Sequence, residues 1–175
     1  MAGLVLLVAT GALGQNVKGV RPDASPLQVG AGFTFVSFHE TPGTTWNNPG
    51  FDASAVYYRD WLGVEGNVSG AFGSENSVST SLFFAGGGVR MRLQNVFSFE
   101  PWVHAVVGYT HVSPQPSFGS DNAAGYKLGG GVDFHPHHGR IGYRVSADML
   151  GTSFFHTYQF SPEVSVGIFV TMGKE

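Results

Sequence analysis

The sequence contains seven histidines, a residue type that can bind metal ions or transfer protons. Three of them lie together in the segment HPHHG at residues 135–139. His135, His137 and His138 could offer imidazole nitrogens to a divalent metal ion. Three histidines this close rarely converge on one ion unaided, and no neighbouring carboxylate has an evident role in orienting their rings. We therefore interpret the segment as a polar turn bent by its proline, and we predict neither a metal site nor a cofactor.

Two further histidines, His104 and His156, raise the question of catalysis. The hydroxyl and acid groups nearest to them in the pattern are Glu100 and Thr110 for the first, and Ser153 and Thr157 for the second. A hydrolytic site needs a nucleophile, a base and an orienting acid within hydrogen-bond reach of one another. His104 falls on a polar strand face, and no acid stands near His156. We therefore predict that the protein is not an enzyme.

Nine charged residues share one property, which is that each falls in the class opposite the long apolar side chains of its segment. They are Glu65, Arg90, Arg92, Glu100, Lys127, Asp133, Arg144, Asp148 and Glu163. The set contains both signs, and a buried charge is costly without a partner. If these residues face the inside of a narrow barrel, they are expected to pair. We predict a closed salt-bridge network rather than a conducting path.

The strand pattern that positions these charges is clearest in residues 51–72. In its second half Leu62, Val64 and Val68 share one face, while Glu65 falls on the other. Period two with apolar and polar residues kept apart is the signature of a strand wetted on one side. The same pattern predicts eight strands, at residues 27–38, 51–59, 62–72, 80–93, 100–112, 123–134, 140–150 and 162–172.

The polar segments between these strands alternate in length. The longer ones are 39–50, 73–79, 113–122 and 151–161, and the shorter ones are 60–61, 94–95 and 135–139. This rhythm is typical of an all-β fold, the eight-stranded antiparallel up-and-down transmembrane β-barrel, with short periplasmic turns and longer outer loops. The pattern shows no helical period after the N-terminal segment and nothing that suggests a second domain.

Composition bears on whether water or lipid surrounds the barrel. Charged residues make up 12% of the chain and aromatic residues 14%, and glycine is abundant in the polar class. Aromatic residues also gather near strand ends, as they do at membrane interfaces: Tyr57, Tyr58, Trp61, Phe97, Phe99 and Trp102. These features favour a membrane barrel. A soluble barrel with an apolar, ligand-binding interior is the less favoured alternative.

The beginning of the chain differs from the rest. Residues 1–14, MAGLVLLVATGALG, are predicted to be a signal peptide, because an apolar run at 4–9 precedes a small-x-small cleavage site at 12–14. Residues 15–26 are predicted to form a flexible leader, and residues 27–175 the barrel domain. A formal net charge of -3 gives no reason to expect nucleic acid as a partner, and the absence of cysteine excludes disulfides.

Three stretches carry a family resemblance: YYRDWLGVEGNVSG, FFAGGGVRMRLQNVFSFEPWVHAVVGYTHV and the final VSVGIFVTM. From about Leu27 onward the chain resembles the small outer-membrane β-barrel family, in particular the eight-stranded transmembrane domain of outer membrane protein A. The resemblance implies a monomer in the outer membrane of a Gram-negative-type bacterium, in contact with outer-membrane lipid. It implies a structural or adhesive role, with host or surface ligands bound by the outer loops. An enzyme that modifies lipid A is the alternative function.

Overall fold

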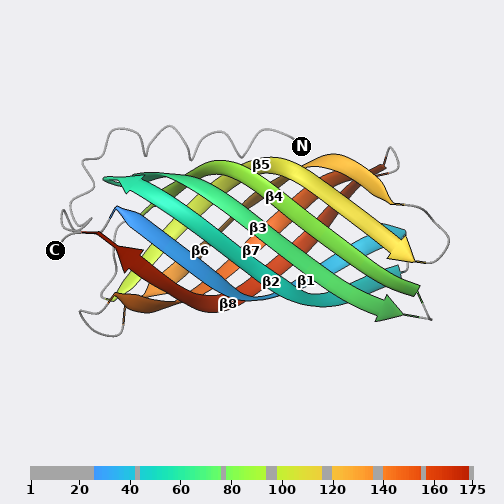
Figure 1. Cartoon of the computed structure of the whole chain (residues 1–175), viewed down its shortest axis with the longest axis horizontal. Helices are drawn as coiled ribbons and strands as arrows, with labels where there is room; N and C mark the ends of the chain where they lie inside the picture. The colour runs from blue at the N-terminus through green and yellow to red at the C-terminus, as the bar shows by residue number, and fades with distance from the viewer. Residues whose placement is uncertain are drawn as a thin grey trace, which may run out of the picture.

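The structure is a computed structural model that describes residues 26–41, 44–75, 78–93, 98–115, 120–135, 140–154 and 157–173. Its strands form one closed antiparallel barrel, in which each strand pairs with its neighbours in the sequence and β1 pairs with β8 (Figure 1). The strands are β1 (Leu27–Thr41), β2 (Thr44–Arg59), β3 (Leu62–Glu75), β4 (Val78–Arg92), β5 (Phe99–Gln115), β6 (Asp121–Phe134), β7 (Ile141–Phe154) and β8 (Thr157–Met172). The predicted fold class is confirmed.

The first strand begins and the last strand ends at the same end of the barrel (Figure 1). Leu27 pairs with Met172, and this seam between β1 and β8 runs on to Val36 and Glu163. We call the end that carries Leu27 and Met172 the proximal end, and the opposite end the distal end. The predicted signal peptide and, except for Pro26, the predicted leader lie outside the described residues, so both stay predictions. Among the described residues no helix is long and apolar enough to cross a membrane.

The distal hairpins correct the predicted strand boundaries. Three of the four segments predicted as longer loops belong largely to strands, and half of the fourth, 113–122, does so too. β1 and β2 stay paired up to Thr41 and Thr44, and β7 and β8 up to Phe154 and Thr157. The connections between β4 and β5 and between β6 and β7, at the proximal end, are longer than these two distal turns. The predicted rhythm of short proximal turns and long distal loops is therefore wrong.

The backbone ladder explains this difference. The hydrogen bonds between two antiparallel strands join backbone groups, so they do not depend on the polarity of the side chains. Ser, Thr and Asn can therefore occupy strand positions where water solvates the outer face. At the distal hairpins the polar residues of the strands therefore have the composition expected of a loop, and the sequence pattern assigned them to loops. The turn predicted at Asp60 and Trp61 is confirmed, and Asp60 has the positive φ of 59° that a tight hairpin turn commonly requires.

The barrel wall separates the two side-chain classes as the alternation predicts. In β3, Val64 is 69% exposed on the outside, whereas the adjacent Glu65 is 1% exposed on the inside. Exposed apolar side chains of this kind occur on every strand of the barrel. A soluble barrel would have the reverse polarity, with apolar residues inside and polar residues outside. The wall therefore has the polarity of a transmembrane barrel.

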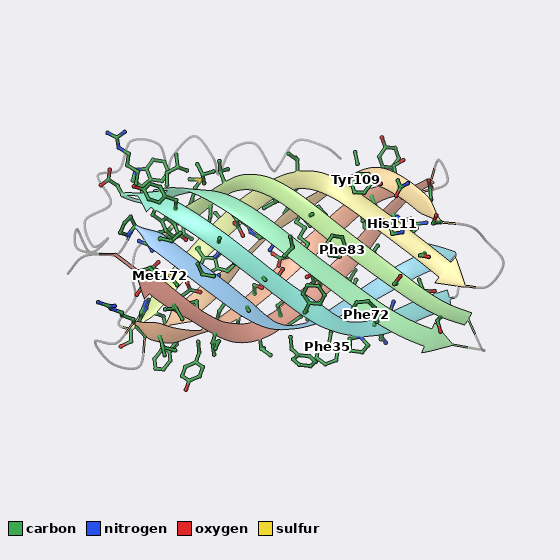
Figure 2. All side chains as sticks on the ribbon, viewed as in Figure 1. Phe35, Phe72, Phe83, Tyr109, His111 and Met172 are labelled. Carbon is green, nitrogen blue, oxygen red and sulfur yellow. The ribbon has the colours of Figure 1, made fainter. Side chains whose placement is uncertain are left out.

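The exposed apolar side chains form a belt around the barrel. Figure 2 labels residues near its distal edge, Phe35, Phe72, Phe83 and Tyr109, and one at its proximal edge, Met172. Along β3 the belt runs from Leu62 to Phe72. This matches the roughly 9–11 residues that a tilted strand needs to cross the hydrocarbon core of a membrane.

Two of the aromatic residues predicted at the membrane interfaces lie inside the barrel instead. Tyr58 is 4% exposed and Trp102 is 2% exposed. Tyr57 and Phe99 lie exposed on the outside, and Phe97 lies outside the described residues. Neighbouring residues of a strand face opposite sides, so Tyr57 and Tyr58 cannot share an interface. Position along the strand, and not aromatic character, decides the face.

The outer wall turns polar beyond the distal aromatic edge. We call its outward-facing residues there the distal collar: Asn47, Ser79, His111, Ser113 and Asn122. His111 Nδ1 lies 2.6 Å from Asn122 Oδ1, which joins β5 to β6 in this collar. Figure 2 shows His111 farther toward the distal end than Tyr109. The strands thus extend past the apolar belt into a rim suited to water.

Candidate functional site in the barrel interior

The nine charged residues selected by the alternation pattern all lie inside the barrel, and none is more than 8% exposed. They gather in four clusters, which we describe from the proximal to the distal end. At the proximal edge, Arg92 Nε lies 2.7 Å from Glu100 Oε1. The guanidinium carbon of Arg92 lies 3.5 Å from the ring centroid of Tyr58. A cation over an aromatic face is favourable, so Tyr58 and Glu100 together stabilise this buried charge.

The second cluster centres on Arg144 and Asp133. Two parallel hydrogen bonds, Nε to Oδ1 and Nη2 to Oδ2, each of 2.7 Å, join them in the bidentate geometry of strong ion pairs. Trp102 Nε1 and Gln28 Nε2 also donate to Asp133, over 2.9 and 3.0 Å. Arg144 donates in turn to Gln28 Oε1 and to Ser54 Oγ, over 2.6 and 3.0 Å. Side chains of β1, β2, β5, β6 and β7 therefore meet at this level.

The third cluster joins Arg90, Glu65, His104 and Asp148. Arg90 forms a bidentate pair with Glu65, in which Nε donates to Oε2 over 2.9 Å and Nη2 donates to Oε1. The same Oε2 lies 3.0 Å from His104 Nδ1, and His104 Nε2 lies 2.9 Å from Asp148 Oδ1. The guanidinium carbon of Arg90 also lies 3.8 Å from the ring centroid of Trp102. This chain of contacts links β3, β4, β5 and β7.

The fourth cluster surrounds the ammonium group of Lys127, which is fully buried. Lys127 Nζ donates to Ser69 Oγ over 2.8 Å and to Glu163 Oε1 over 3.0 Å, and it lies 3.5 Å from Asp52 Oδ2. Thr34 Oγ1 donates to the same Glu163 oxygen over 3.1 Å. The three donors of the ammonium group therefore all face acceptors.

Glycines of the interior class make room for these long side chains. A methyl group at Gly30 would lie 2.9 Å from Arg144 Nη1, and one at Gly131 would lie 2.6 Å from Cζ2 of Trp102. Both separations are shorter than ordinary van der Waals contacts. At Gly30 and Gly131, two glycines of the polar class, the absence of a side chain permits this close approach.

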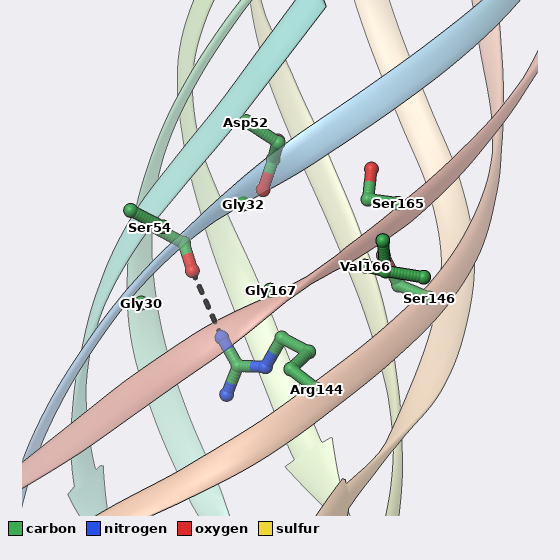
Figure 3. A pocket seen from close by; sticks show the side chains of 10 residues that line it. Gly30, Gly32, Asp52, Ser54, Arg144, Ser146, Ser165, Val166 and Gly167 are labelled. Carbon is green, nitrogen blue, oxygen red and sulfur yellow. Dashed lines mark hydrogen bonds between the residues drawn. The ribbon is translucent and has the colours of Figure 1, made fainter.

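A small cavity lies between the Arg144 cluster and the Lys127 cluster (Figure 3). Its volume of ≈ 10 Å³ is close to the space that one water molecule requires. Asp52, Ser54, Arg144, Ser146 and Ser165 supply its polar lining. The dashed line in Figure 3 marks the hydrogen bond from Arg144 to Ser54, which lies on one side of the cavity.

Beyond the Lys127 cluster the interior gains apolar side chains, a change that the sequence analysis did not predict. They lie among the buried polar residues Asn48, Thr110, Thr152 and Ser161. The side chains of this distal apolar cluster are Val36, Ala71, Leu82, Phe84, Val106, Val112 and Leu150. Lys127 Nζ lies 5.1 Å from the ring centroid of Phe84, where the polar and apolar parts meet. Leu82, Phe83 and Phe84 follow one another in β4, so both faces of the strand are apolar there and the alternation gives no signal.

The contacts of the histidines differ from the catalytic grouping considered above. His104 contacts Glu65 and Asp148, whereas Glu100 pairs with Arg92. His156 lies outside the described residues, so its position relative to Ser153 is not defined. The ring of His135 packs edge-on against Phe169, with 4.9 Å between the ring centroids.

The segment 135–139, considered above as a metal site, is described only in part, because His137 and His138 lie outside the described residues. Within the described ranges, no three side chains of His, Cys, Asp or Glu gather in a way that could hold a metal ion. Sequence reasoning also missed Asp52, Ser54 and Trp102 as interior partners. Each occupies an inward position of its strand, so the alternation of inward and outward positions was the available signal. This alternation does not reveal which side chains meet across the interior.

The closed eight-stranded wall, with an apolar belt outside and paired charges inside, defines a transmembrane β-barrel of the outer-membrane type. Solved structures share this fold. Neisserial surface protein A, NspA, is similar with a TM-score of 0.72 and 15% sequence identity, over 85% of this chain and 99% of that chain.

Two further outer-membrane barrels are similar in structure. For Ail, the attachment invasion locus protein of Yersinia pestis, the TM-score is 0.58 at 15% identity, over 83% of this chain and 99% of that chain. For the outer membrane protein OprG from Pseudomonas aeruginosa, it is 0.59 at 11% identity, over 91% and 100%. At these identities the likeness is one of fold. No family model and no curated protein matches the sequence.

Proposed function

We propose that the protein is a structural barrel of the outer membrane whose interior is closed and whose distal rim recognises a ligand at the cell surface. The observation that carries this proposal is the stack of charge clusters through the interior, followed by the distal apolar cluster. An eight-stranded barrel has an interior that side chains can fill. A cavity with room for about one water molecule between two of the clusters agrees with a closed interior.

The chemistry of the distal end argues against an anionic ligand. One of the similar structures contains Ail with the heparin analogue sucrose octasulfate. Sulfate groups are recognised by Lys and Arg side chains. The segments 37–50, 73–82, 110–124 and 151–161, which make up the distal hairpins, contain neither residue. Hydroxyl and amide groups of the distal collar and the exposed ring of Tyr158 suit hydrogen bonding and stacking, as an uncharged glycan would require.

Tyr158 provides the test of this recognition, because its side chain is 77% exposed near the distal end of β8. Bacteria that display the protein are applied to surfaces coated with uncharged glycans or with heparin. We expect retention on an uncharged glycan, reduced about tenfold by Tyr158→Ser, the effect of losing an exposed aromatic anchor. The matched control is Tyr143→Ser, which removes an exposed tyrosine near the proximal end. Retention on heparin alone, or an equal loss in both variants, would contradict the proposal.

A further inference from the structure

The small cavity between the Arg144 and Lys127 clusters borders the inner face of the seam between β1 and β8. Gly32 pairs with Gly167 across this seam, and both line the cavity together with Gly30, so no side chain of the seam fills the space there. The polar side chains around the space are those of Asp52, Ser54, Arg144, Ser146 and Ser165 (Figure 3). A cavity of ≈ 10 Å³ with polar walls has room for one small ion or one water molecule.

Asp52 brings a carboxylate to the wall of this cavity. Its contacts with Asn67 Nδ2, over 2.9 Å, and with Lys127 Nζ, over 3.5 Å, are both made by Oδ2. Within the described part of the chain Oδ1 accepts no hydrogen bond, and the side chain keeps 17% of its surface accessible. A carboxylate oxygen inside a barrel is costly without a partner. Oδ1 therefore offers an acceptor to whatever occupies the cavity.

Ser165 adds a second acceptor to the cavity wall. Its hydroxyl donates to Thr34 Oγ1 over 2.8 Å, and Thr34 Oγ1 donates in turn to Glu163 Oε1 over 3.1 Å. A hydroxyl group has one proton and two lone pairs, so Ser165 has only lone pairs left for the cavity. The serine and the aspartate thus present oxygen lone pairs to the same small space.

The charges around the cavity leave Asp52 without a cation of its own. Arg144 also lines the cavity, but Asp133 neutralises it in the bidentate pair. Lys127 Nζ lies 2.9 Å from a carboxylate oxygen of Glu163 and 3.5 Å from that of Asp52, so it is shared between them and lies closer to Glu163. Among the described interior residues, the other permanent cations form the pairs Arg90–Glu65 and Arg92–Glu100. The surroundings of the cavity therefore carry an excess of negative charge.

We propose that this cavity binds one small monovalent cation of the alkali metals, which balances the charge of Asp52. The carboxylate of Asp52 and the hydroxyl groups of Ser54, Ser146 and Ser165 supply oxygen ligands, which hard cations prefer. Ca²⁺ takes about six to eight oxygen ligands and Mg²⁺ keeps several of its waters, and the small cavity offers room for neither set. The bound ion joins the Arg144 cluster to the Lys127 cluster. This inference goes beyond the proposed function, because it does not depend on recognition at the distal rim.

A cation that binds only the folded barrel makes the stability of the barrel depend on that cation. Unfolding in denaturant is followed in detergent micelles, in potassium chloride and in N-methylglucamine chloride of equal ionic strength. N-methylglucamine is too large for the cavity. We expect the unfolding equilibrium constant of the wild-type protein to be about tenfold smaller in potassium chloride, at a concentration about ten times the dissociation constant. Equal constants in the two salts would overturn the proposal.

Variants tie this salt dependence to the cavity. Asp52→Asn removes the charge but keeps the shape of the side chain, so we expect its stability to be equal in the two salts. Asp60→Asn is the matched control, because it removes an exposed carboxylate in the turn between β2 and β3, and it is expected to retain the tenfold effect. Ser165→Ala removes a neutral ligand and is expected to retain only part of the effect. A full potassium effect in Asp52→Asn would show that the cation binds elsewhere and would overturn the proposal.

The position of the ion is observed in crystals of the wild-type protein refolded in rubidium chloride, a measurement that needs no variant. Rubidium is the heavier neighbour of potassium in its group, and its anomalous scattering distinguishes it from water. We expect an anomalous peak in the cavity, beside Asp52 Oδ1 and Ser165 Oγ. A cavity that holds water alone, without an anomalous peak, would overturn the proposal.

Discussion

At the scale of single residues, the interior of this barrel depends on partners more than on charge itself. A buried ion pair gains little net stability over well-packed apolar residues, but the loss of one partner leaves the other charge buried and uncompensated. Asp133 illustrates this dependence, since it accepts hydrogen bonds from Arg144, Trp102 and Gln28. Removal of the arginine would leave the carboxylate with neutral donors alone.

Arg144→Ala is therefore expected to destabilise the barrel by about 3–5 kcal/mol. The measurement is the unfolding midpoint in denaturant, followed by tryptophan fluorescence in detergent micelles. Arg140→Ala is the matched control, because Arg140 is an exposed arginine one residue before β7 begins. We expect no comparable shift for the control. Equal midpoints for the wild-type protein and Arg144→Ala would show that Arg144 is not a buried and paired charge.

At the scale of the strands, the sequence predicts the face of each residue better than the length of each element. In β3 the alternation of Val64 and Glu65 assigns the outside and the inside correctly. The same reasoning places the strand ends wrongly at the distal hairpins, because hydrogen bonding between backbones does not require apolar side chains. Where both faces share one character, as at Phe83 and Phe84 of β4, the face follows from the alternation in the rest of the strand, which correctly places Phe83 outside.

The partners in the interior are harder still to predict from sequence. Parity places His104 and Asp148 inside, but it does not indicate that they meet across Gly129. Such a contact depends on the register of three strands, which follows from their pairing around the whole barrel. The nine charges could therefore be assigned to one class from the sequence, whereas the partners that each charge contacts become visible only once the barrel is closed.

The close packing between the strands also predicts how substitution of an interior glycine changes the stability of the barrel. Gly131→Ala is expected to destabilise the barrel by about 1–3 kcal/mol, the usual cost of overpacking, because the methyl group would collide with the backbone oxygen of Val145 and lie 2.6 Å from the ring of Trp102. Gly87→Ala is the matched control, since its methyl group would meet a single atom at 3.6 Å. Unfolding midpoints of both variants check this. A Gly131→Ala protein as stable as Gly87→Ala would contradict the close packing of the interior.

At the scale of the whole molecule, the defining property of the barrel is its inverted polarity, with apolar side chains outside and charged side chains inside. The belt from Leu62 to Phe72 in β3 has the length of a membrane crossing, and polar residues lie beyond its distal edge. The interior holds its charges in pairs and ends in the distal apolar cluster. Such a molecule is suited to lipid outside and to a filled interior. Its contacts with water-soluble ligands are then made by the distal end, which includes the distal collar.

The most direct test of this polarity uses single cysteines, because the native chain has none. Val107→Cys places a thiol in the middle of the apolar belt, where Val107 is 69% exposed, and Asn122→Cys places one in the distal collar. Each variant is inserted into lipid vesicles and labelled with a polarity-sensitive fluorophore. We expect the blue-shifted emission of a lipid environment at position 107 and the emission of an aqueous environment at position 122. Aqueous emission at both positions would contradict this polarity, because the apolar belt would then face water.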